Sequence, residues 1–397
     1  MRDLLLGREP ADLDIVTAAP PEAVAALFDR TIPIGAEFGV VAVVLDGHPY
    51  QVATFRREGP YLDGRRPTSV EFTEAAADVT RRDFTINALL YDPIGDVVID
   101  HVGGRADLER RCIRTVGDPA ARFAEDRLRL LRAVRLAAEL EFDIEPATLA
   151  AITALAPTVA GVSAERVRDE LLRLLIATGR ADGVRQLERT GLLTAILPEV
   201  AGLGEELASV GRALQALRRP TAVLAAATFL HRLDPASTIP DLCRRLRLST
   251  ADTRRITALV ADHGRLCNLR EMARSRARRV LRRDDAADLV ELHRVDCLAR
   301  GRDLITYYLA AELVAAGAGT AAAPPRLLGG DDLIALGYVP GPHFAEMLDA
   351  IEEARARGQI ASPDEARRWI LARFPAGASS RSVEPSGGAV SDPDRGG

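Results

Sequence analysis

Short apolar runs separated by turn residues characterise the first hundred residues. Residues 39–45 and 50–55 are rich in β-branched and other apolar side chains, and Asp46 and Gly47 between them are a strong signal for a hairpin turn. The segment Asp12–Val16 has the composition of another short strand. This part of the chain is therefore expected to contain a small β-sheet.

Helical periodicity dominates the chain beyond residue 104. In Arg127–Leu140 and Arg166–Ile176, apolar residues recur every three or four positions, which is the spacing of one helix face. Ser163 is a suitable N-cap for the second helix. Earlier in the chain, Pro20–Phe28 begins with proline and also has a helical pattern. The pattern predicts a small mixed α/β region followed by a long α-helical region.

The last part of the chain contains a linker and a final helical unit. Residues 317–326 are small residues and prolines, and they separate the long helical region from a helical pattern at 331–374. From Ala376 onward Gly, Ser, Pro and Asp dominate, which is typical of a disordered tail. At 397 residues the chain has room for two or three domains of roughly 100 to 200 residues each.

The composition indicates a globular protein without a membrane span. Hydrophobic residues make up 47% and charged residues 27%, and no apolar run approaches the roughly 20 residues of a transmembrane helix. The N-terminus lacks the basic start and long apolar core of a signal peptide, so a cytoplasmic location is expected. The net charge is −5, so any contact with nucleic acid should be confined to local basic patches.

Asp12 and Asp14, on the first predicted strand, suggest a metal site. Residues two apart on a strand project to the same side, which would bring both carboxylates together at the edge of the sheet. Carboxylates suit Mg²⁺, and metal ions held in this way stabilise both oxygens of a phosphoryl transfer. Two solvated acids at a strand end would have the same sequence. The six histidines are isolated in the sequence, and none is assigned to a metal.

Five segments occur in an order that resembles one known family. They are MRDLLLGREPADLDI (1–15), QVATFR (51–56), RDFTINAL (82–89), IRTVGDPAARFAEDRLRLLRAVR (113–135) and AERVRDELLRLL (164–175). Taken together, over residues 2–200, they resemble the bacterial class II tRNA nucleotidyltransferase and poly(A) polymerase family, which includes the CCA-adding enzymes.

The resemblance implies an α+β fold. A small mixed-sheet nucleotidyltransferase head of the polymerase-β type would be followed by an elongated all-α neck, body and tail. The corresponding segments are 1–104 (catalytic head, truncated at its N-terminus), 105–200 (nucleotide- and RNA-binding neck), 201–316 (body), 329–374 (tRNA-binding tail) and 376–397 (disordered tail).

The resemblance also implies roles for individual residues. Asp12 and Asp14 would be the catalytic residues that hold Mg²⁺. The implied nucleotide-binding residues are Arg2, Arg82, Asp83, Asn87, Asp126, Arg129 and Arg132. Among these, Arg82 and Asp83 would contact the ribose, and Asp126 and Arg129 would face the base.

The choice of base can also be argued from the hydrogen-bonding chemistry of Asp126 and Arg129. They are three residues apart in a predicted helix and would project from one face. Aspartate accepts and arginine donates hydrogen bonds. Cytosine and adenine present an amino donor beside a ring-nitrogen acceptor, whereas uracil and guanine present the opposite pattern. The pair therefore fits C and A, although an ordinary surface salt bridge would have the same spacing.

Two positions depart from the family pattern. Relatives carry a strand and a Gly-Gly pair, expected to approach the triphosphate closely, before a valine whose position is Met1 here. A wrongly chosen start, with GTG read as methionine, is the expected explanation. Gln51 stands where the family usually has a glutamate near the metal ions, and its neutral amide is expected to weaken metal binding.

Two other segments are candidates for contact with RNA or for movement. Residues 265–283 hold eight arginines and one acidic residue, Glu271, which suits RNA phosphates but equally a solvated helix face. The candidate RNA-binding residues are Arg274, Arg278, Arg279 and Arg282. The segment Gly59–Phe72 is expected either to reorient the base site, as the family suggests, or to be an ordinary surface loop.

The resemblance implies the activity of a template-independent RNA nucleotidyltransferase. Residues 329–374 resemble the C-terminal unit of tRNA nucleotidyltransferases, which favours addition of C and A from CTP and ATP to the tRNA 3′ end. The expected partners are tRNA and the two nucleotides, with neither a membrane nor DNA. A poly(A) polymerase or an A-adding enzyme that uses only ATP is one alternative. A catalytically inactive RNA-binding relative is another, because of Gln51 and the missing Gly-Gly pair.

Overall fold

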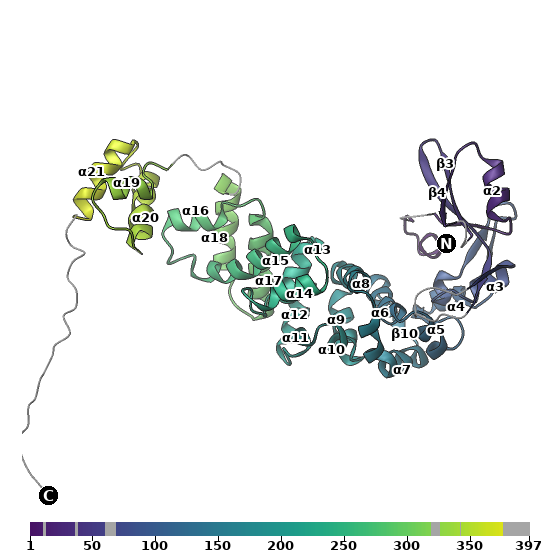
Figure 1. The fold of residues 1–397 in the computed structure, drawn as a ribbon. Coiled ribbons are helices and arrows are strands. Elements are labelled where there is room, and N and C mark those ends of the chain that lie inside the picture. Colours follow the sequence, from purple (N-terminus) through teal and green to yellow (C-terminus); the bar gives the residue numbers. More distant parts are fainter. Residues whose placement is uncertain (11–12, 36–38, 60–68, 319–325, 342, 376–397) are drawn as a thin grey trace, which may run out of the picture. The chain divides into compact units, whose positions relative to one another are not determined.

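The computed structural model describes residues 1–10, 13–35, 39–59, 69–318, 326–341 and 343–375 (Figure 1). The chain divides into two compact units: the first comprises Met1–Gly264 with Glu291–Leu304, and the second Arg265–Val290 with Ile305–Gly397. Helices predominate, and the strands of the described residues all precede residue 145. The predicted α+β class is confirmed, whereas the five predicted segments stay a prediction.

A four-stranded sheet forms the beginning of the first unit. Across the sheet its strands are β1 (Ile15–Thr17), β4 (His48–Thr54), β3 (Val40–Leu45) and β2 (Thr31–Gly35). β1 is parallel to β4, and the other neighbours are antiparallel. Asp46 and Gly47 both have positive φ, 50° and 81°, in the turn between β3 and β4. This is the two-residue hairpin that the sequence predicts.

The first strand begins later than the sequence predicts. β1 starts at Ile15, so Asp14 lies just before the strand, and Asp12 lies outside the described residues. The prediction that Asp14 lies on the strand is therefore wrong. The ladder of β1 begins where Ile15 meets Val52 of β4, and Asp14 precedes this first pair.

Helix α2 (Pro21–Leu27) covers the sheet and agrees with the predicted helix. Pro21 occupies its first turn, where a missing N–H has no cost. Val24 of α2 is buried together with Val43 and Val52 of the sheet. This small apolar cluster fixes β4, the strand that carries Gln51.

Short hairpins and helices connect the sheet to the helical region. They are β5 (Arg56–Glu58) paired with β6 (Val70–Phe72), α3 (Ala75–Val79), the 3-10 turn η2 (Thr85–Asn87), β7 (Leu90–Asp92) paired with β8 (Val97–Ile99), and α4 (Gly104–Glu109). Val79, Ala88, Leu90 and Val116 form the buried cluster between them. Of the predicted mobile segment Gly59–Phe72, residues 60–68 lie outside the described residues.

Helices build the rest of the first unit. They are α5 (Pro119–Glu125), α6 (Leu128–Leu140), α7 (Pro146–Leu155), η3 (Ala156–Gly161), α8 (Ala164–Ile176), α9 (Arg180–Arg189), α10 (Leu192–Ile196), α11 (Pro198–Ala201), α12 (Glu206–Gln215), α13 (Ala222–Leu230), α14 (Thr238–Arg245) and α15 (Thr250–His263). A two-residue parallel pair, β9 (Cys112–Ile113) with β10 (Asp143–Ile144), ties this region together. The division between the units falls within α17 (Ala286–Ala299).

Helices α6 and α8 match the two helices predicted from periodicity. They pack against each other, with apolar residues of both helices buried. Arg135 of α6 is buried between Glu139, at 2.5 Å, and Glu170 of α8. Ser163 occupies the N-cap position of α8 as predicted. A buried ion pair thus joins two helices that also bury apolar side chains against each other.

The second unit contains the end of the described chain. Its helices are α16 (Arg274–Leu281), α18 (Ile305–Leu313), α19 (Gly330–Ala335), α20 (His343–Ala356) and α21 (Pro363–Arg373). Leu333, Met347, Ile351 and Ile370 are buried in a core formed by the last three. The hydroxyl of Tyr338 donates to the carbonyl of Phe374 at 2.5 Å. The predicted helices at 331–374 are present, and the predicted disordered tail, 376–397, lies outside the described residues.

Within the described part of the chain, no helix has both the length and the apolar character needed to cross a membrane.

Candidate active site

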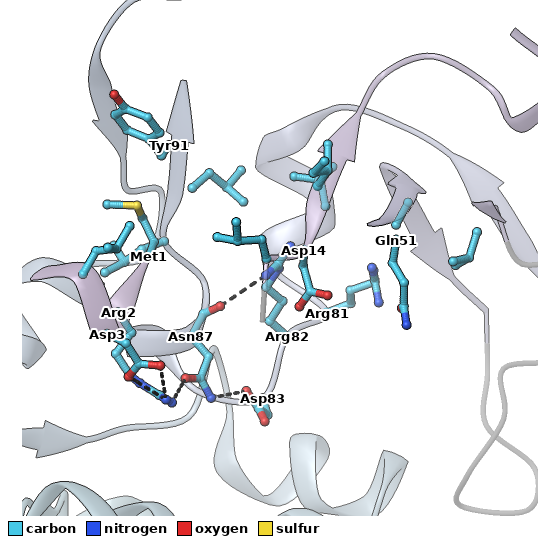
Figure 2. Close-up of a pocket in the computed structure, with 18 of the residues that line it drawn as sticks. Met1, Arg2, Asp3, Asp14, Gln51, Arg81, Arg82, Asp83, Asn87 and Tyr91 are labelled. Carbon is cyan, nitrogen blue, oxygen red and sulfur yellow. Dashed lines mark hydrogen bonds and ion pairs between the residues drawn. The ribbon is translucent and has the colours of Figure 1, made fainter. Parts of the chain in front are cut away.

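A cavity of about 990 Å³ in the first unit gathers the residues of the quoted motifs (Figure 2). It is lined by the start of the chain, β1, β4, the segment Arg81–Asn87 and the start of α6. Every predicted catalytic or nucleotide-binding residue that the structure describes lies in its wall: Arg2, Asp14, Arg82, Asp83, Asn87, Asp126, Arg129 and Arg132. Their roles stay predictions, but the structure brings them together from distant parts of the sequence.

Asp14 and Gln51 lie side by side in this wall (Figure 2). Because Ile15 is paired with Val52 in the parallel ladder of β1 and β4, the residues preceding them, Asp14 and Gln51, are opposite each other. Both side chains are exposed to the cavity. No described residue makes a hydrogen bond or ion pair with the Asp14 carboxylate, which leaves its oxygens available to a ligand.

The donors near Asp14 suit a hard divalent cation. Asp14 offers carboxylate oxygens and Gln51 an amide oxygen, and no cysteine or histidine is found among the described lining residues. Oxygen ligands of this kind suit Mg²⁺ better than a soft metal. The described residues alone contain no group of three or more metal-ligating side chains, and Asp12 is not among them.

Asp83 is the centre of a chain of hydrogen bonds along the cavity wall (Figure 2). Its Oδ1 accepts from the backbone N–H of Phe84 at 2.7 Å and from the side-chain amide of Asn87 at 3.1 Å. Its Oδ2 forms an ion pair with Nε of Arg132 at 2.7 Å. The side-chain amide oxygen of Asn87, Oδ1, in turn accepts from Arg2 at 2.7 Å. Four predicted nucleotide-binding residues therefore hold one another in place.

The turn η2, which carries Asn87, is held by hydrogen bonds to a buried carboxylate. The hydroxyl of Thr85 donates to the fully buried Asp107 at 2.7 Å, and Arg114 donates to the same oxygen at 2.8 Å. Although burial acts against it, these hydrogen bonds lower the pKa of Asp107. Gly104 approaches closely, because a Cβ there would lie 2.2 Å from the Thr85 carbonyl oxygen. The wall of the cavity is thus a rigid support for Asn87.

Asp126 does not lie in a helix, so the predicted helix shared with Arg129 is wrong. Asp126 has φ −144° and ψ 104° in the break between α5 and α6. The reason is local: its carboxylate accepts the backbone N–H of Leu128 at 3.1 Å, a turn that aspartate favours over the helix. Arg129 follows in the first turn of α6. Both side chains still line the cavity.

The side chains of Asp126 and Arg129 are held by other residues and not by each other. Arg166 of α8 donates twice to Asp126, at 2.6 and 3.2 Å. Arg129 donates through Nη1 to Glu125 at 2.6 Å and to the Arg122 carbonyl at 2.9 Å, and through Nη2 to the Arg81 carbonyl at 3.3 Å. The surface salt bridge between the two, considered as an alternative, is absent between these described residues.

Both residues retain hydrogen-bonding capacity for a ligand. Of the five N–H donors of arginine, three of Arg129 have partners among the described residues, which leaves two. Oδ2 of Asp126 accepts only from Arg166 within the described chain, so it has room for a second donor. The wall therefore offers an acceptor and a donor close together, as a base with an amino group beside a ring nitrogen requires.

Arg166 is the residue of this arrangement that sequence reasoning missed. It belongs to the quoted segment 164–175, yet the acids three and four positions further along its own helix are Asp169 and Glu170. A helix surface pair with one of these would have been the local expectation. Its actual partner, Asp126, is 40 residues away in the sequence. Only the packing of α8 beside α6 shows the contact.

The four predicted RNA-binding arginines belong to the second unit. Arg278 is half-buried, Arg282 is exposed, and Arg279 forms an ion pair with Asp349 at 2.6 Å. The side chain of Arg274 lies outside the described residues. Their role in RNA binding stays a prediction.

Comparison with known proteins adds independent information about this chain. Residues 1–114 match the family model described as the poly A polymerase head domain, and residues 141–203 match the model for a probable RNA and SrmB-binding site of polymerase A. The chain is 47% identical over 208 residues to a CCA-adding enzyme of Geobacillus thermodenitrificans, covering 52% of this chain and 51% of that protein. It is 38% identical over 262 residues to one of Lactobacillus johnsonii, covering 66% and 65%.

A solved structure extends the similarity to almost the whole chain. The CCA-adding enzyme of Bacillus stearothermophilus, in complex with CTP, is 32% identical, covers 94% of this chain and 91% of its own, and superposes with a TM-score of 0.70. The chain belongs to the tRNA nucleotidyltransferase and poly(A) polymerase family. The resemblance drawn from the motifs is thus confirmed. Members of this family generally use a divalent metal ion.

The sequence matches to the curated members of the family are partial. The chain spans about half the length of the first of them in these matches, 51% for the Geobacillus thermodenitrificans protein. The two family models match residues up to 203.

Proposed function

We propose that this protein adds C and A residues from CTP and ATP to the 3′ end of tRNA, without a nucleic-acid template and with release of pyrophosphate. The observation that supports this most directly is the acceptor and donor pair of Asp126 and Arg129 in the same cavity wall as Asp14. The relatives named CCA-adding enzymes, one of them solved with CTP, support the same activity.

Selection of the nucleotide would be performed by side chains. An acceptor on Asp126 takes the amino hydrogen of cytosine or adenine, and a free N–H of Arg129 donates to the neighbouring ring nitrogen. Uracil and guanine would place a carbonyl oxygen against the Asp126 carboxylate and leave both buried acceptors without a proton. The same two side chains thus accept both correct nucleotides and reject both incorrect ones.

The nucleotide sugar and phosphates would be oriented by the chain of hydrogen bonds centred on Asp83. Asp83 and Asn87 offer an acceptor and an amide to the ribose, while Arg2, Arg82 and Arg132 place positive charge around the cavity. Arginine suits phosphate oxygens because its planar fork donates in pairs. Holding the nucleotide in this way brings the α-phosphorus into line with the RNA 3′-hydroxyl.

Asp12 and Asp14 would hold Mg²⁺. When bound there, the metal ion supplies Lewis-acid activation of the 3′-hydroxyl and stabilises charge on the transferring phosphate. The Asp14 carboxylate has no hydrogen-bond or ion-pair partner among the described residues, and Gln51 beside it offers a neutral amide oxygen. The 3′-oxygen forms its bond to the α-phosphorus as the bond to pyrophosphate breaks, so no covalent enzyme intermediate is required.

The second unit would hold the body of the tRNA. Arg278, Arg279 and Arg282 supply positive charge on and after α16. Contacts of this kind to phosphates position an RNA without reading its sequence. A tRNA substrate also places the activity in the cytoplasm.

Nucleotide addition to defined tRNA ends tests the proposal. The protein would be incubated with magnesium and labelled CTP or ATP on transcripts that end before CCA, after C, or after CC. Addition of CCA to the shortest transcript is the expected result. Addition of A alone to the CC end would instead identify an A-adding enzyme, and unlimited A on any RNA a poly(A) polymerase. No incorporation with either nucleotide would favour an inactive RNA-binding relative.

A further inference from the structure

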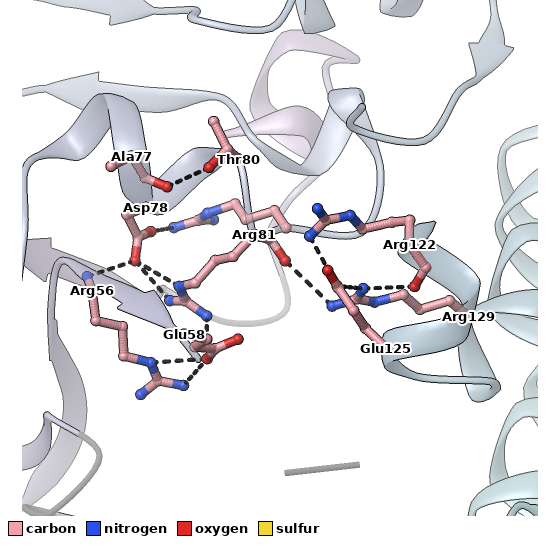
Figure 3. A network of polar contacts seen from close by, with 10 residues as sticks. Arg56, Glu58, Ala77, Asp78, Thr80, Arg81, Arg122, Glu125 and Arg129 are labelled. Atoms are coloured by element: carbon pink, nitrogen blue, oxygen red, sulfur yellow. Dashed lines mark hydrogen bonds and ion pairs between the residues drawn. The ribbon is translucent and has the colours of Figure 1, made fainter. Parts of the chain in front are cut away.

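Arg81 is anchored by two buried carboxylates (Figure 3). Asp78 of α3 accepts from its guanidinium at 2.8 and 2.9 Å, and Glu58 of β5 accepts at 3.0 Å. The side chains of Asp78 and Glu58 are 1% and 7% exposed, so these ion pairs are shielded from water. Shielded, multiply bonded pairs of this kind hold their geometry far better than surface pairs.

Both carboxylates are held in turn by Arg56 of β5. Its side chain donates to Glu58 at 2.8 and 3.0 Å, and its backbone N–H donates to Asp78 at 3.1 Å. β5 is itself paired with β6 in a short hairpin. The anchor of Arg81 is therefore part of the hairpin and α3, which lie outside the helices that carry Arg129.

The backbone of Arg81 contacts the candidate base-reading arginine (Figure 3). Its carbonyl oxygen accepts from Nη2 of Arg129 at 3.3 Å. The other two partners of Arg129 both belong to α5, namely Glu125 and the Arg122 carbonyl, and Arg122 also pairs with Glu125 at 3.0 Å. The Arg81 carbonyl is thus the described partner of Arg129 that comes from the sheet side of the cavity.

A guanidinium group is planar, so its orientation is set by where its donors are bound. The two partners on α5 both bind Nη1, so they hold the guanidinium of Arg129 from one end. The third contact, at Nη2, holds the other end, where it helps to set the directions of the two N–H groups left for a base. A shift of the Arg81 carbonyl would change those directions without removing any group that touches the nucleotide.

We propose that Arg81, fixed by Glu58 and Asp78, is a positioning residue that sets the orientation of Arg129 for base selection. This proposal rests on the proposed function, because it assumes that Arg129 reads the base. Base selection would then also depend on the β5–β6 hairpin and α3, neither of which carries a base-reading residue. Discrimination between nucleotides then depends on how tightly the β5–β6 hairpin holds Arg81.

The variants Arg81→Met and Glu58→Gln test this role. Arg81→Met keeps the backbone carbonyl and the apolar stem but removes the anchor together with a guanidinium that lines the cavity. Glu58→Gln leaves that guanidinium in place and removes one charge from its anchor. Equilibrium binding of CTP and of UTP is measured in the presence of Ca²⁺ for the full chain. We expect the preference for CTP over UTP to fall about tenfold in Arg81→Met and less in Glu58→Gln.

Glu71→Gln is the matched control, because Glu71 lies on the other strand of the hairpin with an exposed side chain. It should retain the full preference. Thermal unfolding of each variant separates a local change from loss of the fold, and Glu58→Gln keeps the test valid if Arg81→Met does not fold.

Combination with Arg129→Ala decides whether Arg81 acts through Arg129. In that background Arg81→Met should have no further effect on the preference for CTP, since the group that it positions is gone. An equal loss in both backgrounds, or an unchanged preference in folded Arg81→Met, would overturn the proposal. The proposed function is tested separately, by nucleotide transfer. A wild-type protein that prefers CTP in binding but transfers no nucleotide to tRNA would refute nucleotide addition. The binding data would still decide whether Arg81 positions Arg129.

Discussion

Arg166 donates two hydrogen bonds to Asp126, at 2.6 and 3.2 Å, from a position 40 residues later in the chain. The contact joins α8 to the break between α5 and α6 and uses both carboxylate oxygens. A paired arrangement of this kind fixes the plane of a carboxylate as well as its position. The acceptor proposed for the base therefore owes its orientation to a helix that does not itself line the cavity.

The variant Arg166→Lys should weaken base selection. A lysine retains the charge but donates from a single point, so Asp126 would be free to turn. We expect kcat/KM for CTP to fall about tenfold or more, as for loss of one hydrogen bond to a charged group, and misincorporation of UTP to rise. Arg173→Lys is the control on the same helix, because the Arg173 side chain is 61% exposed and its ion pair with Glu139 is long, at 3.6 Å. Equal effects of both variants would argue against a specific role of Arg166.

The variant Asp14→Asn should abolish nucleotide addition. Among the described carboxylates of the cavity wall, Asp14 is the one without an ion pair to the protein. Because metal activation contributes several kcal/mol, a loss of roughly 10³-fold or more in kcat is expected. Affinity for tRNA, measured by filter binding, should stay within about twofold because phosphate contacts supply most of it. The exposed Asp29→Asn serves as control. If Asp14→Asn lost tRNA affinity to the same degree, the metal site would have to lie elsewhere.

The variant Gln51→Glu should tighten metal binding. It places a second carboxylate opposite Asp14 across the β1–β4 ladder. We expect the dissociation constant for Mn²⁺, measured by electron paramagnetic resonance, to fall about tenfold, and nucleotide addition to reach saturation at lower magnesium. Gln359→Glu, at an exposed position of the second unit, should change neither quantity. Unchanged Mn²⁺ binding in Gln51→Glu would mean that Gln51 does not face the metal.

Local chemistry explains which parts of the structure could be predicted from the sequence. Asp46 and Gly47 predicted a hairpin because both residues tolerate positive φ, and the structure has positive φ at both. The long periodic segments predicted α6 and α8. The apolar face of a helix is visible in the spacing of its own residues, whichever element covers it. The site residues that the motif matches predict all line one cavity where the structure describes them, although their roles stay predictions.

Contacts between distant residues explain what the sequence did not predict. The sequence does not show that Asp126 leaves the helix. An aspartate can either continue a helix or form a turn like the one that Asp126 makes with Leu128, and the sequence pattern does not distinguish the two. Arg166 has closer acids in its own helix and gave no signal for Asp126. The histidines are isolated in the sequence, yet the rings of His231 and His263 lie 5.7 Å apart, and Nε2 of His231 lies 3.2 Å from Asp296.

The variant Glu170→Gln should destabilise the first unit. Glu170 is the buried partner of Arg135, and its loss leaves the charge of Arg135 to Glu139 alone. Breaking a buried pair by removing one partner costs about 3–5 kcal/mol, so the midpoint of denaturant unfolding should fall clearly. Glu165→Gln on the same helix is the control, because Glu165 is 55% exposed and 4.0 Å from its partner Arg247. Equal midpoints for the two variants would show that the buried pair contributes little to stability.

His293 should make the stability of the first unit depend on pH. Burial, with the nearby His263 adding to it, lowers the pKa of His293 to about 4, whereas Asp296 acts in the opposite direction. In the unfolded chain a histidine titrates near its ordinary pKa of about 6.5, so between these values the unfolded state binds a proton that the folded state does not. Stability should therefore decrease as pH falls from about 6.5 towards 4. In His293→Gln the unfolding temperature should fall less steeply over this range than in the wild type, while the exposed His48→Gln should follow the wild type. An identical slope in wild type and His293→Gln would assign the acid sensitivity to other groups, first to His263, whose pKa is also lowered by burial.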